Sequence, residues 1–143
     1  DASGDLVLGD SPPDSCGWKI GISSSDAPQA KIDRFLYLHN MAVATSGDAL
    51  QHVVIDGKRY SHIVNPHTGL GLTDQSRVTV IAPNGMTADS LASAISVLGP
   101  DKGIKLLNQK PGTACLILRH ENGKMKSYES SCFSRYELKR NQP

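Results

Sequence analysis

The feature that most constrains this chain is a change in the period of its apolar residues near residue 85. Before it, apolar residues come in short runs, of which SRVTVIA (76–82) alternates most clearly and predicts a half-buried strand. After it, apolar residues recur at the three- and four-residue spacing of a helix. Strands that come in runs, with helices clustered late, predict an α+β fold rather than an alternating α/β fold. The helical stripe consists of Ala88, Leu91, Ala92, Ile95 and Leu98.

This late region predicts two consecutive helices packed on one face of the sheet. Thr87 is a suitable N-cap for a first helix near 87–98. Gly99-Pro100 ends that helix and starts a second one near 100–108. We expect the apolar stripe of the first helix to point into the core, because an amphipathic helix buries its apolar face.

Apolar runs bounded by turn residues predict an antiparallel or mixed sheet. The pair Asp56-Gly57 favours a tight hairpin turn, and Glu121-Asn122-Gly123 marks a second hairpin near the end. The region 35–47 is predicted as one or two strands ended by Ser46-Gly47, and 23–30 as a polar connection. The predicted strand regions are 5–9, 17–22, 35–47, 50–64, 76–82, 114–120 and 124–130.

Length and charge exclude several classes of protein. The 143 residues suffice for one domain with a core. The formal net charge is +1, and no basic cluster interleaves with aromatic residues, so we expect no nucleic-acid partner. No apolar run approaches the roughly 20 residues of a membrane span, and no signal peptide is found. Because the chain begins at Asp1 within a strand-like stretch, we expect a processed or truncated chain.

The cysteine pattern is uninformative about compartment. Cys16, Cys115 and Cys132 are widely spaced and form no CxxC motif, which argues against a zinc site. One disulfide with a free thiol is left open. GxGxxG, GxxxxGK[ST] and GxSxG motifs are also absent, so Rossmann, P-loop and nucleophile-elbow sites are not supported.

The stretch YSHIVNPHTG (60–69) places a histidine where a strand ends. A histidine can accept a proton near neutral pH, as a general base must. Asn65-Pro66 breaks the strand and leaves backbone groups free for a ligand. A lone histidine on a strand is more often an ordinary surface or core residue, and the other histidines show no metal-ligand spacing. His62 is therefore a candidate base whose surroundings matter.

Asp89 and Ser93 form a second candidate pair. They are four residues apart on the predicted first helix, so their side chains share one face. Two oxygen ligands suit a hard cation such as Mg²⁺, with phosphate oxygens and waters completing its shell. The competing interpretation is that an acidic residue near a helix start is favoured by the helix dipole alone.

Three motifs resemble, in order and spacing, the ApbE family of FAD:protein FMN transferases. They are AVATSGD (42–48), GKRYSHIVNPHTG (57–69) and VTVIAPNGMTADSLASAISVLGPDKG (78–103). DASGD (1–5) is similar to the family's Asn-x-Gly-Gly-Asp turn, and SCFSRYEL (131–138) to its C-terminal segment. The resemblance covers essentially the whole chain. It implies that residues 1–143 are the C-terminal part of an ApbE-like, T-fold-like domain whose N-terminal half is absent.

The resemblance implies a Mg²⁺-dependent reaction. FAD is cleaved at its pyrophosphate, FMN is transferred to a threonine or serine hydroxyl of a target protein, and AMP is released. The catalytic histidine of the family falls on His62, and its helix metal ligands fall on Asp89 and Ser93. Contacts to FAD fall on Val64, through its backbone, and on Asn65. We expect Asp89 and Ser93 to lie close to His62, since metal, substrate and base must meet in one pocket.

The resemblance also implies partners and a location. The targets of such enzymes are flavin-accepting subunits of redox-driven membrane pumps and related electron-transfer proteins. A periplasmic protein, or a membrane-anchored lipoprotein on the extracytoplasmic side, is the location that the family implies.

Several positions depart from the family pattern. Asn65 stands where an Asp is usual, Ser93 where a Thr is usual, and Ser3 replaces a Gly. No Lys-Gly segment of the family's N-terminal half precedes DASGD. The alternatives are a non-catalytic ApbE-like flavin-binding module and a purely structural fragment. Retention of His62, Asp89 and a hydroxyl at position 93 favours the transferase.

Overall fold

The computed structural model describes residues 1, 4–23, 31–47 and 51–137. Ser3, Asp48 and most of the predicted connection 23–30 lie outside the described residues. The elements are β1 (Leu6–Leu8), β2 (Trp18–Ile22), β3 (Arg34–Leu38), β4 (Met41–Gly47), β5 (His52–Ile55), β6 (Lys58–Ser61), β7 (Ser76–Ala82), α1 (Gly85–Asn108), β8 (Ala114–Glu121), β9 (Lys124–Glu129) and the short 3₁₀ helix η1 (Phe133–Arg135). The predicted α+β class is confirmed, and 35–47 divides into two strands.

A five-stranded sheet in the order β1-β4-β7-β8-β9 forms the centre of the fold. Every neighbouring pair in it is antiparallel, which settles the antiparallel or mixed alternative for this sheet. Two separate hairpins, β2-β3 and β5-β6, extend from it. In the β5-β6 hairpin, Asp56 and Gly57 both have positive φ, 50° and 75°, as a tight hairpin turn with this pair requires.

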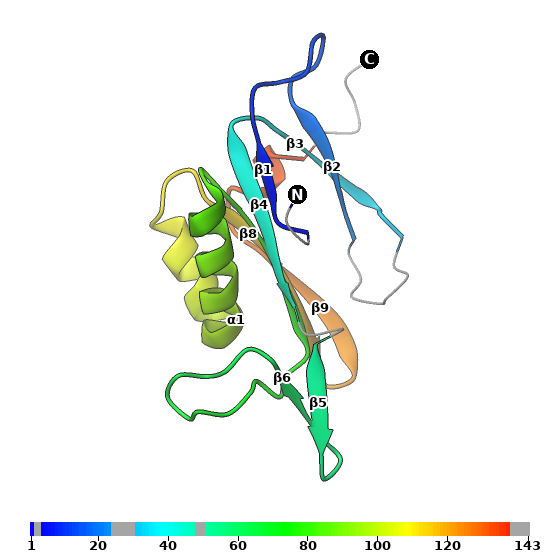
Figure 1. Ribbon diagram of the computed structural model, residues 1–143, viewed down its shortest axis with the longest axis vertical. Helices are drawn as coiled ribbons and strands as arrows, with labels where there is room; N and C mark the ends of the chain where they lie inside the picture. The colour runs from blue at the N-terminus through cyan, green and yellow to red at the C-terminus, as the bar shows by residue number, and fades with distance from the viewer. Residues whose placement is uncertain (2–3, 24–30, 48–50, 138–143) are drawn as a thin grey trace.

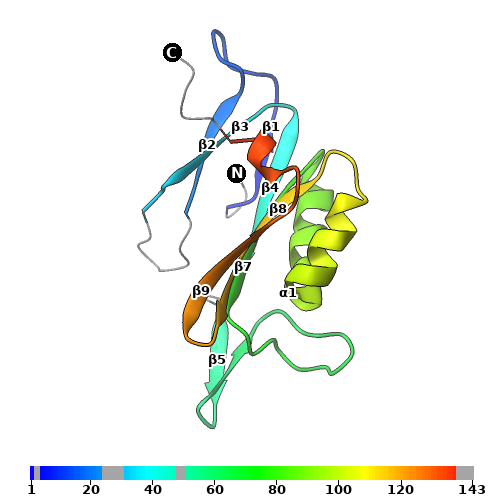
Figure 2. The same cartoon turned by 180° about the vertical axis from the view of Figure 1, so that it is seen from behind.

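The central sheet is covered on both faces (Figures 1 and 2). On one face α1 packs against alternate residues of β4, β7 and β8. On the other, β2-β3 and η1 pack against the residues in between, with Phe133 fully buried among them. The strand predicted at 76–82 is confirmed as β7, but its predicted half-burial is wrong, because six of its seven residues are buried. The second covering layer comes from distant segments, and alternation within the strand does not reveal it.

The helical region carries one label, α1, and consists of two helical parts joined at a break. The α1 segment runs from Gly85 to Asn108, but its backbone leaves helical geometry at Gly99, with φ 75° and ψ 175°. A Cβ at Gly103 would lie 2.7 Å from Cγ2 of Ile95. Residues eight apart in a straight helix are about 12 Å apart along its axis, so the later part folds back on the earlier one. The break falls at the predicted Gly99-Pro100 pair.

Two details predicted for this helix are wrong. The N-cap is Asn84, whose side chain accepts the Thr87 N–H at 2.9 Å, so Thr87 lies within the first turn instead of capping it. Leu98 is 41% exposed rather than buried, because the chain turns at the next residue and lifts this side chain off the sheet. The rest of the predicted stripe is buried, namely Ala88, Leu91, Ala92 and Ile95.

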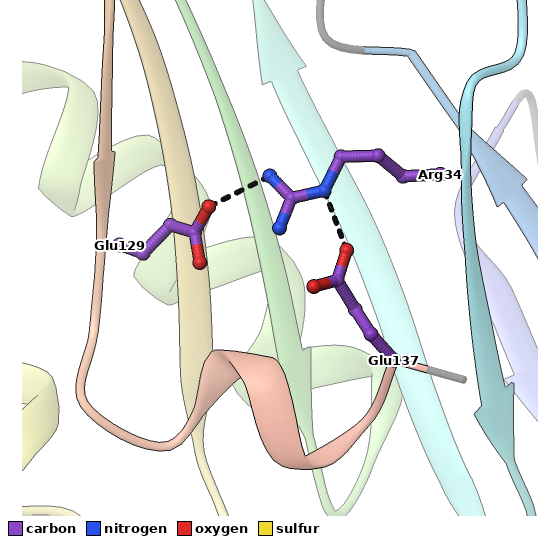
Figure 3. Close-up of polar contacts among 3 residues, drawn as sticks. All are labelled: Arg34, Glu129 and Glu137. Atoms are coloured by element: carbon purple, nitrogen blue, oxygen red, sulfur yellow. Dashed lines mark hydrogen bonds and ion pairs between the residues drawn. The ribbon is translucent and has the colours of Figure 1, made fainter. Parts of the chain in front are cut away.

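The end of the described chain is tied to β3 by backbone pairing and by Arg34 (Figure 3). Arg34 donates to Glu129 at 2.7 Å and to Glu137 at 2.5 Å. These carboxylates hold the pKa of the Arg34 guanidinium above its ordinary value, with the hydrogen bond to Glu137 as the larger cause. The three cysteines are free, which removes the disulfide left open by the sequence.

Candidate active site

The segment after β6 forms a small irregular hairpin that carries the first group of candidate residues. The Ser61 N–H donates to Leu72 O at 2.8 Å, and the Leu72 N–H donates to Ile63 O at 2.9 Å. A single bridge pairs Val64 with Gly71. The strand region predicted at 50–64 divides into β5 and β6, and β6 ends at Ser61, one residue before His62.

The position of His62 is fixed by one carbonyl. The His62 backbone N–H donates to Gln51 O at 3.2 Å, and ring Nδ1 lies 3.1 Å from the same oxygen. A carbonyl oxygen can only accept, so Nδ1 is the protonated nitrogen of the neutral ring. Nε2 is then left with its lone pair, and the side chain is exposed. His62 is thus held in the tautomer that a general base needs.

Val64 presents unused backbone groups. Two hydrogen bonds flank the Val64–Gly71 bridge: one from the Asn65 N–H to Leu70 O (2.9 Å) and one from the Leu72 N–H to Ile63 O. In an antiparallel ladder this pattern makes Val64 and Gly71 a non-hydrogen-bonded pair. The N–H and C=O of Val64 therefore point away from Gly71, and within the described part of the chain they have no hydrogen-bond partner. This geometry fits the predicted backbone contact of Val64 with a ligand.

Asn65 uses most of its polar groups to close the turn. Its carbonyl accepts from Thr68 and Gly69, and its side-chain oxygen accepts the His67 N–H at 2.9 Å. The expectation that Asn65-Pro66 leaves the backbone free for a ligand therefore fails at Asn65 itself, because these groups shape the loop. Its side-chain amide nitrogen has no partner among the described residues and is the group left for a ligand contact.

Asp89 and Ser93 lie together on the exposed side of α1. Neither side chain has a hydrogen-bond or ion-pair partner among the described residues. Since α1 begins at Gly85, Asp89 is in the second turn, where the helix dipole contributes little. The competing explanation of Asp89 by the dipole is therefore weakened.

These donors fit Mg²⁺ only in part. Carboxylate and hydroxyl oxygens are the ligand types that Mg²⁺ prefers, but its shell holds six. Within the described ranges no group of three or more His, Cys, Asp or Glu side chains could hold a metal. Asp89 and Ser93 would therefore hold the ion only together with phosphate oxygens, waters or groups from elsewhere in the protein.

The two groups of candidate residues share a side of the sheet. Both views show the segment between β6 and β7 on the side that α1 covers (Figures 1 and 2). Along α1, Gly99 comes ten residues after Asp89, and it packs on Arg119, the ion-pair partner of Asp74. Ten helical residues correspond to about 15 Å. No hydrogen bond or ion pair in the described structure links His62 to Asp89 or Ser93, and their closeness stays a prediction.

Sequence reasoning missed the groups that hold this site. Gln51 acts through its backbone carbonyl, and no side-chain motif reports such a role. Asp74 pairs with Arg119 at 2.8 Å across 45 residues of sequence, a contact that only the strand register reveals. The sequence does offer one indication of the role of Gly71, since a glycine in or beside a strand often marks a site where another backbone segment approaches closely.

The fold is α+β, and the candidate residues offer an exposed imidazole, free backbone groups and oxygen-bearing side chains of the kind that hard cations prefer. The chain belongs to the ApbE family, whose family model matches residues 1–117. In the described residues, no helix is both long and apolar enough to cross a membrane.

The chain is similar to several curated proteins named FAD:protein FMN transferase. The relative from Vibrio cholerae is 33% identical over 121 residues, which are 84% of this chain and 36% of the relative. The relative from Haemophilus influenzae is 33% identical over 108 residues, 74% of this chain and 31% of the relative. The chain thus spans about a third of the length of these relatives.

Solved structures give the same family. The ApbE protein of Thermotoga maritima matches with a TM-score of 0.78 and 33% identity, over 97% of this chain and 44% of that one. The apo flavinyl transferase ApbE of Pseudomonas stutzeri matches with a TM-score of 0.75 and 31% identity, over 95% of this chain and 42% of that one.

Proposed function

We propose that this chain belongs to a Mg²⁺-dependent FAD:protein FMN transferase, in which His62 is the general base. The observation that carries the proposal is the hydrogen bond from His62 Nδ1 to Gln51 O, which leaves Nε2 exposed as an acceptor. The names of the family's curated members support the reaction class. Residues 1–143 would supply the C-terminal part of the domain.

In the proposed reaction, the hydroxyl oxygen of a threonine or serine in the acceptor attacks the phosphorus on the FMN side of the FAD pyrophosphate. The bond from that phosphorus to the AMP phosphate oxygen breaks, and AMP leaves. Nε2 of His62 takes the hydroxyl proton, because a protonated hydroxyl is a weak nucleophile. The Val64 backbone and the Asn65 amide would bind the nucleotide beside the base.

Asp89 and Ser93 would hold Mg²⁺ by their oxygens. Bound there, the ion would neutralise pyrophosphate charge and the charge that develops on AMP. Base and ion act on the same pyrophosphate, so the proposal requires His62, Asp89 and Ser93 to meet in one pocket when FAD is bound.

The partners and location belong to the same proposal. Acceptors would be flavin-carrying subunits of redox-driven membrane pumps or related electron-transfer proteins. The protein would work in the periplasm, or as a lipoprotein anchored on the extracytoplasmic side. Family membership is the support for both.

The direct test is incubation of the full-length protein with FAD, Mg²⁺ and a candidate acceptor, followed by intact-mass analysis for added FMN. His62→Ala should lower the rate by about 10²–10⁴-fold, the usual contribution of a positioned base. FAD affinity should change little. His67→Ala is the matched control, since this exposed histidine lies in the same loop and only its backbone N–H is bonded. Equal rates for the two variants would remove His62 from catalysis.

The metal assignment has a separate test. Asp89→Asn should raise the Mg²⁺ concentration needed for half-maximal rate, since an anionic ligand is lost. Excess Mg²⁺ should partly rescue this variant and should not rescue His62→Ala. Asp101→Asn, an exposed acid later on α1, is the control. FAD binding without FMN addition to any acceptor would favour the alternative, a non-catalytic ApbE-like flavin-binding module.

A further inference from the structure

Arg119 lies where three separate segments meet. It sits on β8, opposite Ser76 at the start of β7. Its Nη2 lies 2.8 Å from Oδ2 of Asp74, near the end of the segment that carries His62. Its Nε lies 4.0 Å from Oε1 of Glu121, further along β8. Both partners of the Asp74 pair are largely shielded, with side chains 27% and 29% exposed.

The same guanidinium also approaches the break in α1. A Cβ at Gly99 would lie 3.0 Å from Nη1 of Arg119. Gly99 has φ 75° and ψ 175°, a backbone conformation that is readily reached only by glycine. The break in α1 therefore packs directly on Arg119.

We propose that Arg119 is a positioning residue for the candidate active site: it holds the 62–75 segment, through Asp74, in a fixed arrangement with the break of α1. The role in transfer rests on the proposed function of His62. Arg119 itself touches no reacting atom in this proposal. It acts through the segment that carries His62 and Val64.

The shape of the arginine side chain explains why this residue type is needed. A guanidinium presents its nitrogens in a rigid planar fork, and here Nη2 faces Asp74, Nη1 faces Gly99 and Nε faces Glu121 on Arg119's own strand. A lysine has a single nitrogen and could serve Asp74 alone. Asp74 is followed directly by Gln75, whose carbonyl accepts the His120 N–H at 3.0 Å and so attaches residue 75 to β8. The ion pair with Arg119 attaches the next residue toward the loop, Asp74, to the same strand.

The test compares Arg119→Gln with Lys126→Gln in the full-length protein. Lys126→Gln removes an ion pair of the same 2.8 Å length, to Glu121 at the same end of the sheet, but does not touch the 62–75 segment. In Arg119→Gln, exchange of the bonded amides of Asn65, Gly69 and Leu72 should accelerate by about 2- to 5-fold, the range for loss of a partly exposed ion pair. Lys126→Gln should leave these amides unchanged.

Two further readouts separate positioning from general stability. The ¹⁵N signals of the His62 ring should show one Nδ1–H tautomer in the unaltered protein and averaging between tautomers in Arg119→Gln. The kcat for FMN transfer should fall by about 10-fold with little change in the KM for FAD, since a displaced base costs rate rather than binding. Arg119→Lys, which keeps the charge, should be intermediate and covers the case in which Arg119→Gln does not fold.

Asp74→Asn gives an independent check. It should reproduce the Arg119→Gln effects, and the double variant should be no worse than either single one, because the two side chains act as one pair. Unchanged exchange and an unchanged His62 tautomer in Arg119→Gln, or equal effects in Lys126→Gln, would overturn the positioning role. Absence of FMN addition by the unaltered protein would instead overturn the proposed function, so the two failures are distinguishable.

Discussion

Gly71 makes the closest backbone approach in the candidate site. A Cβ on this residue would overlap the carbonyl oxygen of Ser61 and lie 3.2 Å from its nitrogen. The hydrogen bond between Ser61 and Leu72 depends on that approach, and so does the pairing that turns the free groups of Val64 outward. A single missing side chain therefore sets the shape of the loop.

Gly71→Ala should lower the free energy of unfolding by about 1–3 kcal/mol, the usual cost of forcing atoms into a packed site. Denaturant unfolding measures this, and exchange of the Leu72 amide should accelerate with it. Gly9→Ala is the matched control, because a Cβ there meets nothing within 4 Å and φ is not positive. Equal stability of the two variants would show that the 61–72 segment adapts to a Cβ without cost.

Cys115 gives a prediction for pH. Burial raises the pKa of its thiol to about 11, against hydrogen bonds with Ser130 that lower it. A cysteine in an unfolded chain titrates near 8.5. Below that value both states hold the proton, and the stabilisation is fully present. As pH rises toward the folded pKa, the unfolded thiol ionises first, so the free energy of unfolding must fall.

The measurement is denaturant unfolding at several pH values between about 8 and 11. The contribution of Cys115 to the slope is at most about 1.4 kcal/mol per pH unit. Cys115→Ala should reduce the fall in the free energy of unfolding between about pH 8 and 11. This holds whatever the substitution does to stability at neutral pH. Cys16→Ala, which alters an exposed thiol, should keep the slope of the unaltered protein. Identical slopes in all three proteins would rule out the buried thiol as the cause.

At the scale of elements, the start of α1 shows what local sequence can and cannot reveal. The apolar period located the helix and most of its buried face. It missed the first turn, because Gly85 and Met86 add nothing to the stripe and Met86 is 83% exposed. The N-cap was consequently placed three residues late. A search for Asn before a helix, without regard to the stripe, would have found Asn84.

The corrected cap predicts unequal effects of two neighbouring substitutions. Asn84→Ala should cost about 0.5–2 kcal/mol, because the Thr87 N–H loses its acceptor. Thr87→Ala should stay within about 0.5 kcal/mol, since the Thr87 contact uses its backbone and not its side chain. Urea unfolding of both variants measures the two losses in the free energy of unfolding and shows which residue caps the helix. A larger loss for Thr87→Ala would restore the cap that the sequence predicted.

For the molecule as a whole, the sequence predicts the fold class and the hairpins but not the order of strands. Hairpins depend on neighbouring residues, such as Asp56-Gly57 and Asn122-Gly123, which take the positive φ values that their turns need. The place of β4 between β1 and β7, and the second layer that buries β7, depend on contacts far apart in the chain. His62 and Asp89 are candidates on local pattern and family resemblance, whereas the contacts of Gln51 and Arg119 depend on the register.

The Arg34 cluster joins parts of the chain that are about a hundred residues apart. Its guanidinium donates to Glu129 and Glu137 (Figure 3). It also lies 5.2 Å from the ring centroid of Phe133, which is fully buried. It thereby fixes the C-terminal segment over one face of the sheet. Two carboxylates share this one cation, so its removal would leave both of them without their shared counter-charge.

Arg34→Gln should therefore lower the free energy of unfolding by about 1.5–3 kcal/mol, the range for hydrogen bonds to charged groups. Exchange of the Tyr37 amide, which donates to Tyr136 O at 2.9 Å, should accelerate, because the C-terminal segment loses its attachment to β3. Lys126→Gln, which breaks a more exposed pair, should lower the free energy of unfolding by less than Arg34→Gln does. The contrary result is that the two substitutions lower the free energy of unfolding equally and leave the Tyr37 amide protected. That result would show that backbone pairing alone holds the C-terminal segment and that the Arg34 ion pairs do not stabilise it.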